Sequence, residues 1–468
     1  MRRDDIQLEP PLVRHPDVVP AVEDRSYLAY IVSALVIALA AGFALAVILP
    51  LAESGTIPGA LRVPRLIQAH GWAQLQGWAG LFVAGMAMRL IPRFAGRQPI
   101  KRSVTLSILA LLVTSVVVRT IAEPFIDGTA GEMLVLLAAI AGAAGTGATA
   151  VVLAVTLMRG RRKREPWRYF AFAGTAWWFA WAAFILLAGI RAAGNARYTP
   201  VALDDALTWI VLLAAVGNFI WAVQSRSVPV FFGRKTPAIR AALVPGFALN
   251  VGALAISLSL LPLSEVASAR LEGAGLLLGG IAFAWLAPVA GSVWGSAHRL
   301  RPRSRPAARF VLAANLSAIA AGVLLAWAGS ESLWQGSFAA VGVRDAARHT
   351  LGLGVVTMLI LGMAQLVAPV FALDRAEARK SGLVERSPFW LLLAATLLRI
   401  YAGLIFGHMD EATRLHLVAT AGVLGWLAIA LFAVTVVKAL RREPRMRALL
   451  ATGYAEAAAR NAKPRPGA

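Results

Sequence analysis

Long uninterrupted apolar runs dominate this chain, and they restrict its fold more than any other feature. An apolar run of about 20 residues crosses the hydrocarbon core of a bilayer as one helix. Backbone polar groups in lipid must bond within the structure, and a barrel would show short alternating segments instead. Hydrophobic residues make up 59% of the 468 residues, and charged residues only 15%. We therefore predict an all-α membrane protein embedded in the lipid bilayer.

The apolar runs predict about twelve transmembrane helices that are joined by short loops. The expected ranges are 27–50, 66–91, 104–122, 132–158, 168–190, 205–226, 240–262, 272–296, 307–329, 347–371, 388–407 and 413–438. They form a single transmembrane domain over residues 27–440, with polar tails at 1–26 and 441–468. The polar N-terminal stretch lacks an apolar segment beside a cleavage site, so we expect no cleaved signal peptide.

Basic residues alternate strictly between the two sides of the predicted bundle. One side, which includes both tails, carries 36 of the 46 Lys and Arg residues, whereas the opposite loops carry 9. Because basic loops stay in the cytoplasm, both termini are expected to be cytoplasmic. The net charge of +22 follows from this asymmetry, so we expect no binding to nucleic acid.

Three predicted spans share one C-terminal pattern, a proline followed two residues later by phenylalanine. The prolines are Pro92, Pro229 and Pro369, which recur at nearly equal intervals along the chain. The period contains four spans, so we expect three pseudo-repeated groups of four helices. This arrangement differs from the two six-helix halves of the major-facilitator transporters.

Four histidines are expected near the outer side of the bundle: His70, His349 and His416 about one turn into spans, and His408 in a loop. A histidine inside a span is costly unless it has a partner or a function. Cysteine is absent, so a metal would need His, Met or carboxylate ligands. The other interpretation is a helix-end histidine bonded to a loop carbonyl.

His70 and His349 occupy corresponding places, at nearly the same sequence distance before the repeated proline. Helices related by pseudo-symmetry can bring such residues to face one another. Two neutral imidazoles on one iron would form a bis-histidine haem b site. His408 and His416 are candidate ligands of a second metal such as copper, which we rank below haem.

The topology, with a histidine in span 2 and another in span 10, resembles subunit I of the haem–copper oxidases. The stretches HGWAQLQGWAGLFVAGMAMRLIPRF and DAARHTLGLGVVTMLILGM are more similar to the NnrS family. That family consists of twelve-span proteins of the bacterial cytoplasmic (inner) membrane, described as containing haem and copper and as acting in the nitric-oxide response. The resemblance implies haem, copper and nitric oxide as partners.

Several positions depart from these families. Trp72 occupies the position at which the family often has a second histidine, two residues after His70. Ala347 occupies the position of the histidine that binds the active-site haem in the oxidases. Span 6 contains Asn218 and Trp221 but no histidine. The resemblance therefore does not extend to a binuclear reduction centre.

Charged residues near these histidines have alternative roles. Arg348 and Arg399 are candidate partners of haem propionates, although Arg399 could instead pair with Asp410 or Glu411. Adjacent acidic residues, Asp204 and Asp205, are expected to cap span 6.

Three functions remain open: a haem-binding protein linked to nitric-oxide or metal stress, a transporter of a small solute, and an assembly protein without cofactor. The sequence leaves open whether the protein is an enzyme.

Overall fold

The computed structural model describes residues 25–58, 62–160, 164–195, 197–291, 305–371 and 383–461. Within these ranges all regular secondary structure is helical. Four spans contain a π-helical segment, labelled η, between α-helical parts. The helices of the first half are α1 (Ser26–Ile37), η1 (Ala38–Gly42), α2 (Phe43–Glu53), α3 (Val63–Trp72), η3 (Ala73–Gly80), α4 (Leu81–Phe94), α5 (Arg102–Phe125), α6 (Gly128–Arg159), α7 (Pro166–Ala193), α8 (Val201–Trp209), η4 (Ile210–Ala215) and α9 (Val216–Phe232).

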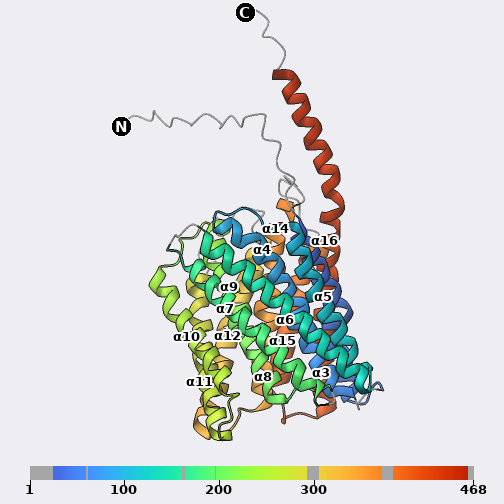
Figure 1. Cartoon of the computed structure of the whole chain (residues 1–468), viewed down its shortest axis with the longest axis vertical. Helices are drawn as coiled ribbons and strands as arrows, with labels where there is room; N and C mark the ends of the chain where they lie inside the picture. Colours follow the sequence, from blue (N-terminus) through green and yellow to red (C-terminus); the bar gives the residue numbers. More distant parts are fainter. Residues whose placement is uncertain are drawn as a thin grey trace, which may run out of the picture.

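The second half of the chain has the same character and ends in the longest helix. Its helices are α10 (Ile239–Leu258), α11 (Glu265–Ala290), α12 (Arg305–Gln335), α13 (Val341–His349), η6 (Thr350–Thr357), α14 (Met358–Phe371), α15 (Leu383–Leu404) and α16 (Glu411–Asn461). The last helix therefore continues past residue 440, where the sequence placed the end of the transmembrane domain, and projects from the bundle (Figure 1).

Eleven helical stretches among the described residues are long and apolar enough to cross a membrane. This confirms a multi-pass, all-helical membrane protein. The expected span 66–91 is also one continuous helix, α3–η3–α4, but it is not among the eleven. Gln68, His70, Gln74 and Gln76 make this span, which carries the candidate ligand His70, more polar than a typical membrane helix.

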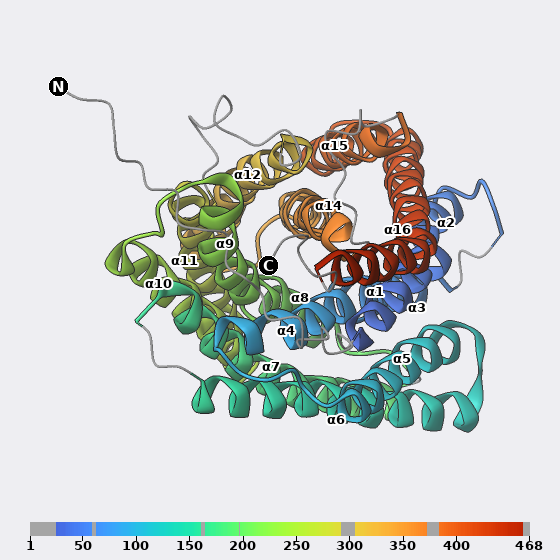
Figure 2. The same ribbon diagram turned by 90° about the horizontal axis from the view of Figure 1, so that it is seen from above.

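Two spans are enclosed by the others. The most apolar 18-residue stretch is 83% buried in Val201–Phe232 and 72% buried in Val341–Gln365. In the other nine spans at most 56% of this stretch is buried. From above, α12, α15 and α16 curve around α14 (Figure 2). Because these two spans have little contact with lipid, their polar side chains face protein rather than hydrocarbon.

The π-helical segments of three spans start at equivalent positions. Segments η3, η4 and η6 begin at Ala73, Ile210 and Thr350, each at an identical sequence distance before Pro92, Pro229 and Pro369 respectively. π-Helical turns are rare and are frequently found at functional sites. Three helices that are far apart in sequence thus change from α-helix to π-helix at the same number of residues before their C-terminal proline.

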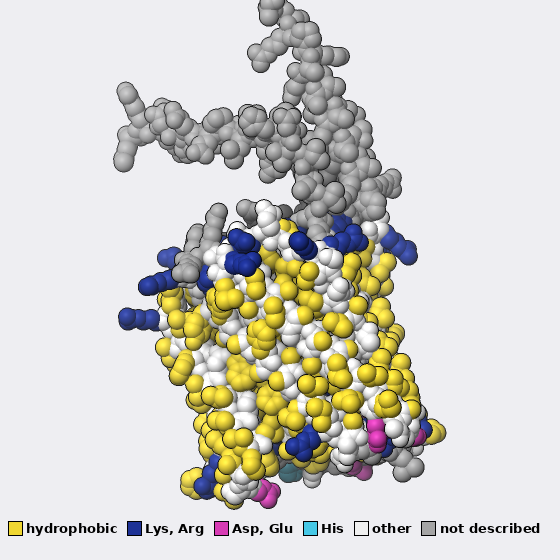
Figure 3. Space-filling view, viewed as in Figure 1, with side chains coloured by type: hydrophobic (Ala, Val, Ile, Leu, Met, Phe, Trp, Pro, Cys, Tyr) yellow, Lys and Arg dark blue, Asp and Glu magenta, His cyan; other side chains and the backbone are white. Residues whose placement is uncertain are grey.

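Charge divides the two ends of the bundle. Lys and Arg side chains gather at the end from which α16 projects, above a broad apolar belt, whereas acidic side chains lie at the opposite end (Figure 3). The apolar belt is what a bilayer requires, and the basic end corresponds to the loops that the sequence places on one side.

Candidate functional site

His70 is held by the first span. It lies on α3, three residues before η3, and its Nδ1 is 2.8 Å from the carbonyl oxygen of Gly42 at the end of η1. A carbonyl oxygen only accepts hydrogen bonds, so Nδ1 must donate. In a neutral imidazole the other nitrogen, Nε2, then presents its lone pair.

His349 is oriented in the same way by its own helix. Its Nδ1 donates to the backbone oxygen of Asp345 at 2.9 Å, and one carboxylate oxygen of Asp345 lies 3.2 Å away. Arg399 fixes that carboxylate through contacts of 2.7 and 3.0 Å. Metal-binding histidines commonly donate their second N–H to a carboxylate or a carbonyl. His349 has both partners, and its Nε2 makes no hydrogen bond with the described part of the chain.

The helices that carry the two histidines are joined at one level. Trp78 Nε1 in η3 donates to Thr357 Oγ1 in η6 at 3.0 Å. His70 lies eight residues before Trp78, and His349 lies eight residues before Thr357. Both histidines are therefore displaced equally from the bond toward the acidic end, which places them at the same depth. They also lie within electrostatic range of one another. The sequence-predicted pair is therefore brought to the same region of the fold.

Open space adjoins both histidines. A Cβ added to Gly71, beside His70, or to Gly352, one helical turn from His349, would meet no heavy atom within 4 Å. Other glycines inside the described helices, such as Gly77 and Gly354, would place a Cβ within 3 Å of a neighbour. The structure therefore leaves room beside the two imidazoles, although the rest of the interior is closely packed.

His70 and His349 would be the residues to hold a haem iron, through their Nε2 atoms, with the adjoining space available for the group. Among the described residues, no group of three or more His, Cys, Asp and Glu side chains is arranged to hold a metal ion. A two-ligand haem site does not require such a group.

A cluster of buried ion pairs surrounds this region, and sequence reasoning missed most of it. Asp205 bonds to both Arg344 and Arg348, and Arg344 also contacts Glu272 at 2.6 Å. The expectation that Asp204 and Asp205 cap span 6 is wrong. The N-cap of α8 is Pro200 and no side chain caps it, because the Asp205 carboxylate faces the arginines of α13.

The two arginines proposed from the sequence both have protein partners. Arg348 bonds to Asp205 and lies 4.9 Å from the Trp209 ring. Arg399 pairs with Asp345 and not with Asp410 or Glu411. Asp410 instead caps α16 through Thr413, and Glu411 binds Arg414. These outer acids satisfy local helix-end groups, so they do not reach Arg399.

A second ion pair lies within α5, and its arginine connects this helix to the loop before α8. Arg119 Nε and Glu123 Oε2 are 2.9 Å apart, with side chains only 2% and 0% exposed. Arg119 also donates to Thr199, whose backbone exchanges two hydrogen bonds with Gln68 of α3. Arg119 and Glu123 are four residues apart on one helix, as are Asp345 and His349. This spacing is the sequence signal from which both pairs could have been predicted.

The other two candidate histidines lie apart from this pair. His408 and His416 are both exposed. His416 contacts Thr56 Oγ1 at 3.2 Å and the oxygen of Ala412 at 2.6 Å. No interaction in the described part of the chain joins either one to His70 or His349.

Fold, charge distribution and the half-buried histidine pair together define a multi-pass helical membrane protein with a candidate ligand pair near one end. A family model for the NnrS protein matches residues 27–444. The chain belongs to the NnrS family. No curated protein matches the sequence.

Proposed function

We propose that this protein binds haem b through His70 and His349. The observation that carries the proposal is the placement of two imidazoles at equal depth, each with Nδ1 held by a carbonyl and Nε2 free. The space beside Gly71 and Gly352 supports it. When bound, the haem would supply a redox-active iron.

Polar groups near the histidines suit the edge of a haem. The indole N–H groups of Trp72 and Trp209 are buried without a hydrogen-bond partner, as is Nε of Arg348. A propionate is an acceptor that would satisfy such donors. Arg348 and Arg399 would then serve propionates while also holding Asp205 and Asp345. We rank copper, with His408 and His416 as ligands, below haem.

The wider setting is proposed on family membership and on the charge pattern. We place the protein in a bacterial cytoplasmic membrane, with the basic end and both termini in the cytoplasm. The equal offsets of η3, η4 and η6 support three pseudo-repeated groups of four helices. A role in nitric-oxide or metal stress follows from the NnrS family, with nitric oxide as a ligand if one histidine leaves the iron.

An optical spectrum of the purified protein from haem-replete cells tests the proposal. We expect sharp α and β bands on reduction and about one haem per chain. His70→Ala and His349→Ala should each abolish the bis-histidine spectrum, whereas His416→Ala should not change it. A folded, colourless protein that takes up no added haem would refute the proposal.

A small-solute transporter is the second candidate function, and the buried Glu123 favours it. One carboxylate oxygen of Glu123, Oε1, lacks a hydrogen-bond partner. Buried acids inside a membrane often carry protons in transporters. This function predicts proton- or sodium-driven flux into vesicles that persists in His70→Ala, and haem retention distinguishes the two proposals.

A further inference from the structure

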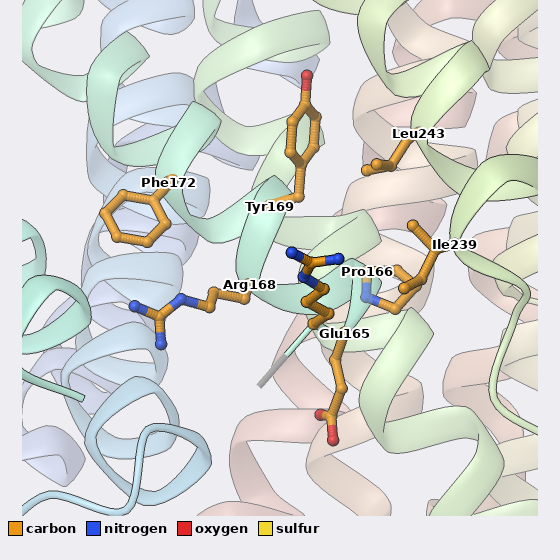
Figure 4. A pocket seen from close by; sticks show the side chains of 8 residues that line it. Glu165, Pro166, Arg168, Tyr169, Phe172, Ile239 and Leu243 are labelled. Atoms are coloured by element: carbon orange, nitrogen blue, oxygen red, sulfur yellow. The ribbon is translucent and has the colours of Figure 1, made fainter. Parts of the chain in front are cut away.

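A cavity of about 590 Å³ opens between α7 and α10, at the basic end of the bundle and far from the histidines along the chain. Its lining is Arg164, Glu165, Pro166, Arg168, Tyr169, Phe172, Ile239 and Leu243. Figure 4 shows Tyr169 of α7 on one side, and Ile239 and Leu243 of α10 on the other. The lining is thus apolar along both helices, and its charged residues lie just before α7 or in its first turn.

Helices α7 and α10 contact each other below the cavity, further along each helix than their first residues. A Cβ on Gly246 of α10 would lie 2.7 Å from the ring of Phe170, so the helices approach closely there. Deeper in the bundle, Trp177 Nε1 donates to Asn250 Oδ1 at 2.7 Å. Toward the basic end the two helices leave a wedge-shaped cavity between Tyr169 on one side and Ile239 and Leu243 on the other (Figure 4).

The charges at the mouth favour an anion. Glu165 accepts a hydrogen bond from Trp167 at 2.6 Å and lies 3.3 Å from Arg226, so its carboxylate is compensated. Arg164 is exposed and makes no ion pair with the described residues. Arg168 donates to the Leu157 carbonyl and lies over the Phe172 ring at 5.3 Å.

Two helix N-termini add to this positive field. Both α7 and α10 start at the cavity, with Glu165 and Ala238 at the N-caps, and neither has a side-chain cap. The N-terminus of a long helix attracts anions through its unpaired N–H groups. Because α7 begins with Pro166, which has no N–H, and Arg168 N donates to the Glu165 oxygen, the backbone donors come mainly from α10, and an anion here would meet them together with Arg164.

We propose that this cavity binds one anionic phospholipid. The phosphate lies against Arg164 and the two helix N-termini, and an acyl chain packs along Tyr169, Ile239 and Leu243. The charge at the mouth and the apolar wedge match the two parts of such a lipid, whereas a free phosphate would leave the apolar wall unused. Basic pockets between helices at a membrane surface are known to recognise lipid headgroups.

Native mass spectrometry of the full chain, delipidated and then titrated with phosphatidylglycerol or phosphatidylcholine, tests the proposal. We expect one tightly held phosphatidylglycerol per chain and weaker, unsaturated adducts of phosphatidylcholine. Arg164→Gln should weaken the binding about fivefold. Arg309→Gln, at an exposed position at the start of α12, serves as the matched control and should have no effect.

Two further arms separate the sources of binding. Leu243→Trp fills the wedge while keeping both arginines, and it should also reduce phosphatidylglycerol binding. Glycerol phosphate, which has the headgroup chemistry without acyl chains, should neither bind nor compete. Circular dichroism checks that each variant is folded. Equal binding of both lipids, or unchanged binding in the arginine and tryptophan variants, would show annular lipid only and overturn the proposal.

Discussion

Trp78 donates its indole N–H to the hydroxyl of Thr357, which lies 279 residues further along the chain. This 3.0 Å bond connects the π-helical segments of the two helices that carry His70 and His349. Thr357 also donates to the Gly352 carbonyl at 2.8 Å. This interhelical bond thus ties the two helices together at one level, and it lies in the interior, where it is protected from solvent and lipid.

Trp78→Phe should remove this bond and keep most of the packing. Interhelical hydrogen bonds in membrane proteins contribute about 0.6 kcal/mol on average, so we expect a small loss of stability in detergent unfolding. If the haem proposal is correct, the same variant should release haem faster than wild type. Trp426→Phe, which removes an exposed indole bond to Leu39, is the control. Equal haem loss in both variants would contradict a positioning role for Trp78.

Glu123→Ala should destabilise the protein strongly. The change leaves the Arg119 guanidinium buried without its carboxylate, and breaking a buried pair costs about 3–5 kcal/mol. Replacing both residues, as Arg119→Met with Glu123→Leu, should recover much of that loss because no charge remains buried. Unfolding titrations of the two variants measure the difference. A double variant no more stable than Glu123→Ala would show that the unpaired Arg119 charge is not what destabilises the single variant.

Asp345→Asn tests the orientation of His349 and depends on the haem proposal. The substitution keeps the backbone acceptor but removes the carboxylate that lies beside His349 and Arg399. Loss of such an outer partner commonly costs about 10- to 100-fold in metal affinity. We expect weaker haem retention and a shifted reduction potential. Asp410→Asn, at an acid that contacts neither group, should retain haem like wild type.

Acid should loosen the turn that follows α5. A hydrogen bond from Arg197 lowers the pKa of Asp127 below its ordinary value of 3.8. This contribution to stability is complete above that value and disappears as the pH falls through the lower, folded-state pKa. Hydrogen exchange across residues 125–129, corrected for intrinsic rates, should be constant near neutrality and rise below about pH 4. Asp127→Asn should remove the acid-dependent part, and an unchanged acid response would contradict the assignment.

Arg197 itself lies in the loop between α7 and α8 and is strained. Arg197 adopts a φ of 68°, an uncommon conformation for a residue other than glycine. Its guanidinium bonds to the Ile126 oxygen and to Asp127. These bonds from a single side chain hold the backbone there, so Arg197→Ala should increase exchange at every pH.

The fold class was predictable because it depends on run length and charge alone. Apolar runs predicted the spanning helices, and the proline spacing singled out the three helices that contain η3, η4 and η6. The π-helical segments themselves could not be predicted, since their sequences resemble ordinary apolar helix. The span 66–91 is less apolar than the other predicted spans because it contains several glutamines. Its proline ending nevertheless identified it as a member of the repeat.

The candidate site was only partly predictable. His70 and His349 stood out as polar residues in apolar surroundings, and the structure places them at one depth. The partners of Arg348 and Arg399 could not be inferred, because Asp205 and Asp345 reach them across helices that lie far apart in sequence. Asp205 was interpreted as a cap from its position at a helix start, and the burial of opposing arginines determined its actual role.

The open position at Gly71 has a practical consequence, because the chain contains no cysteine. A cysteine introduced there would be the sole thiol of the molecule, with space for its side chain and no background from other sites. A spin label or fluorophore attached to it would report distances and solvent entry in the interior from one defined point. The molecule thus offers a ready reporter position beside His70, whereas at most other helical glycines of the described chain an added side chain would meet a close neighbour.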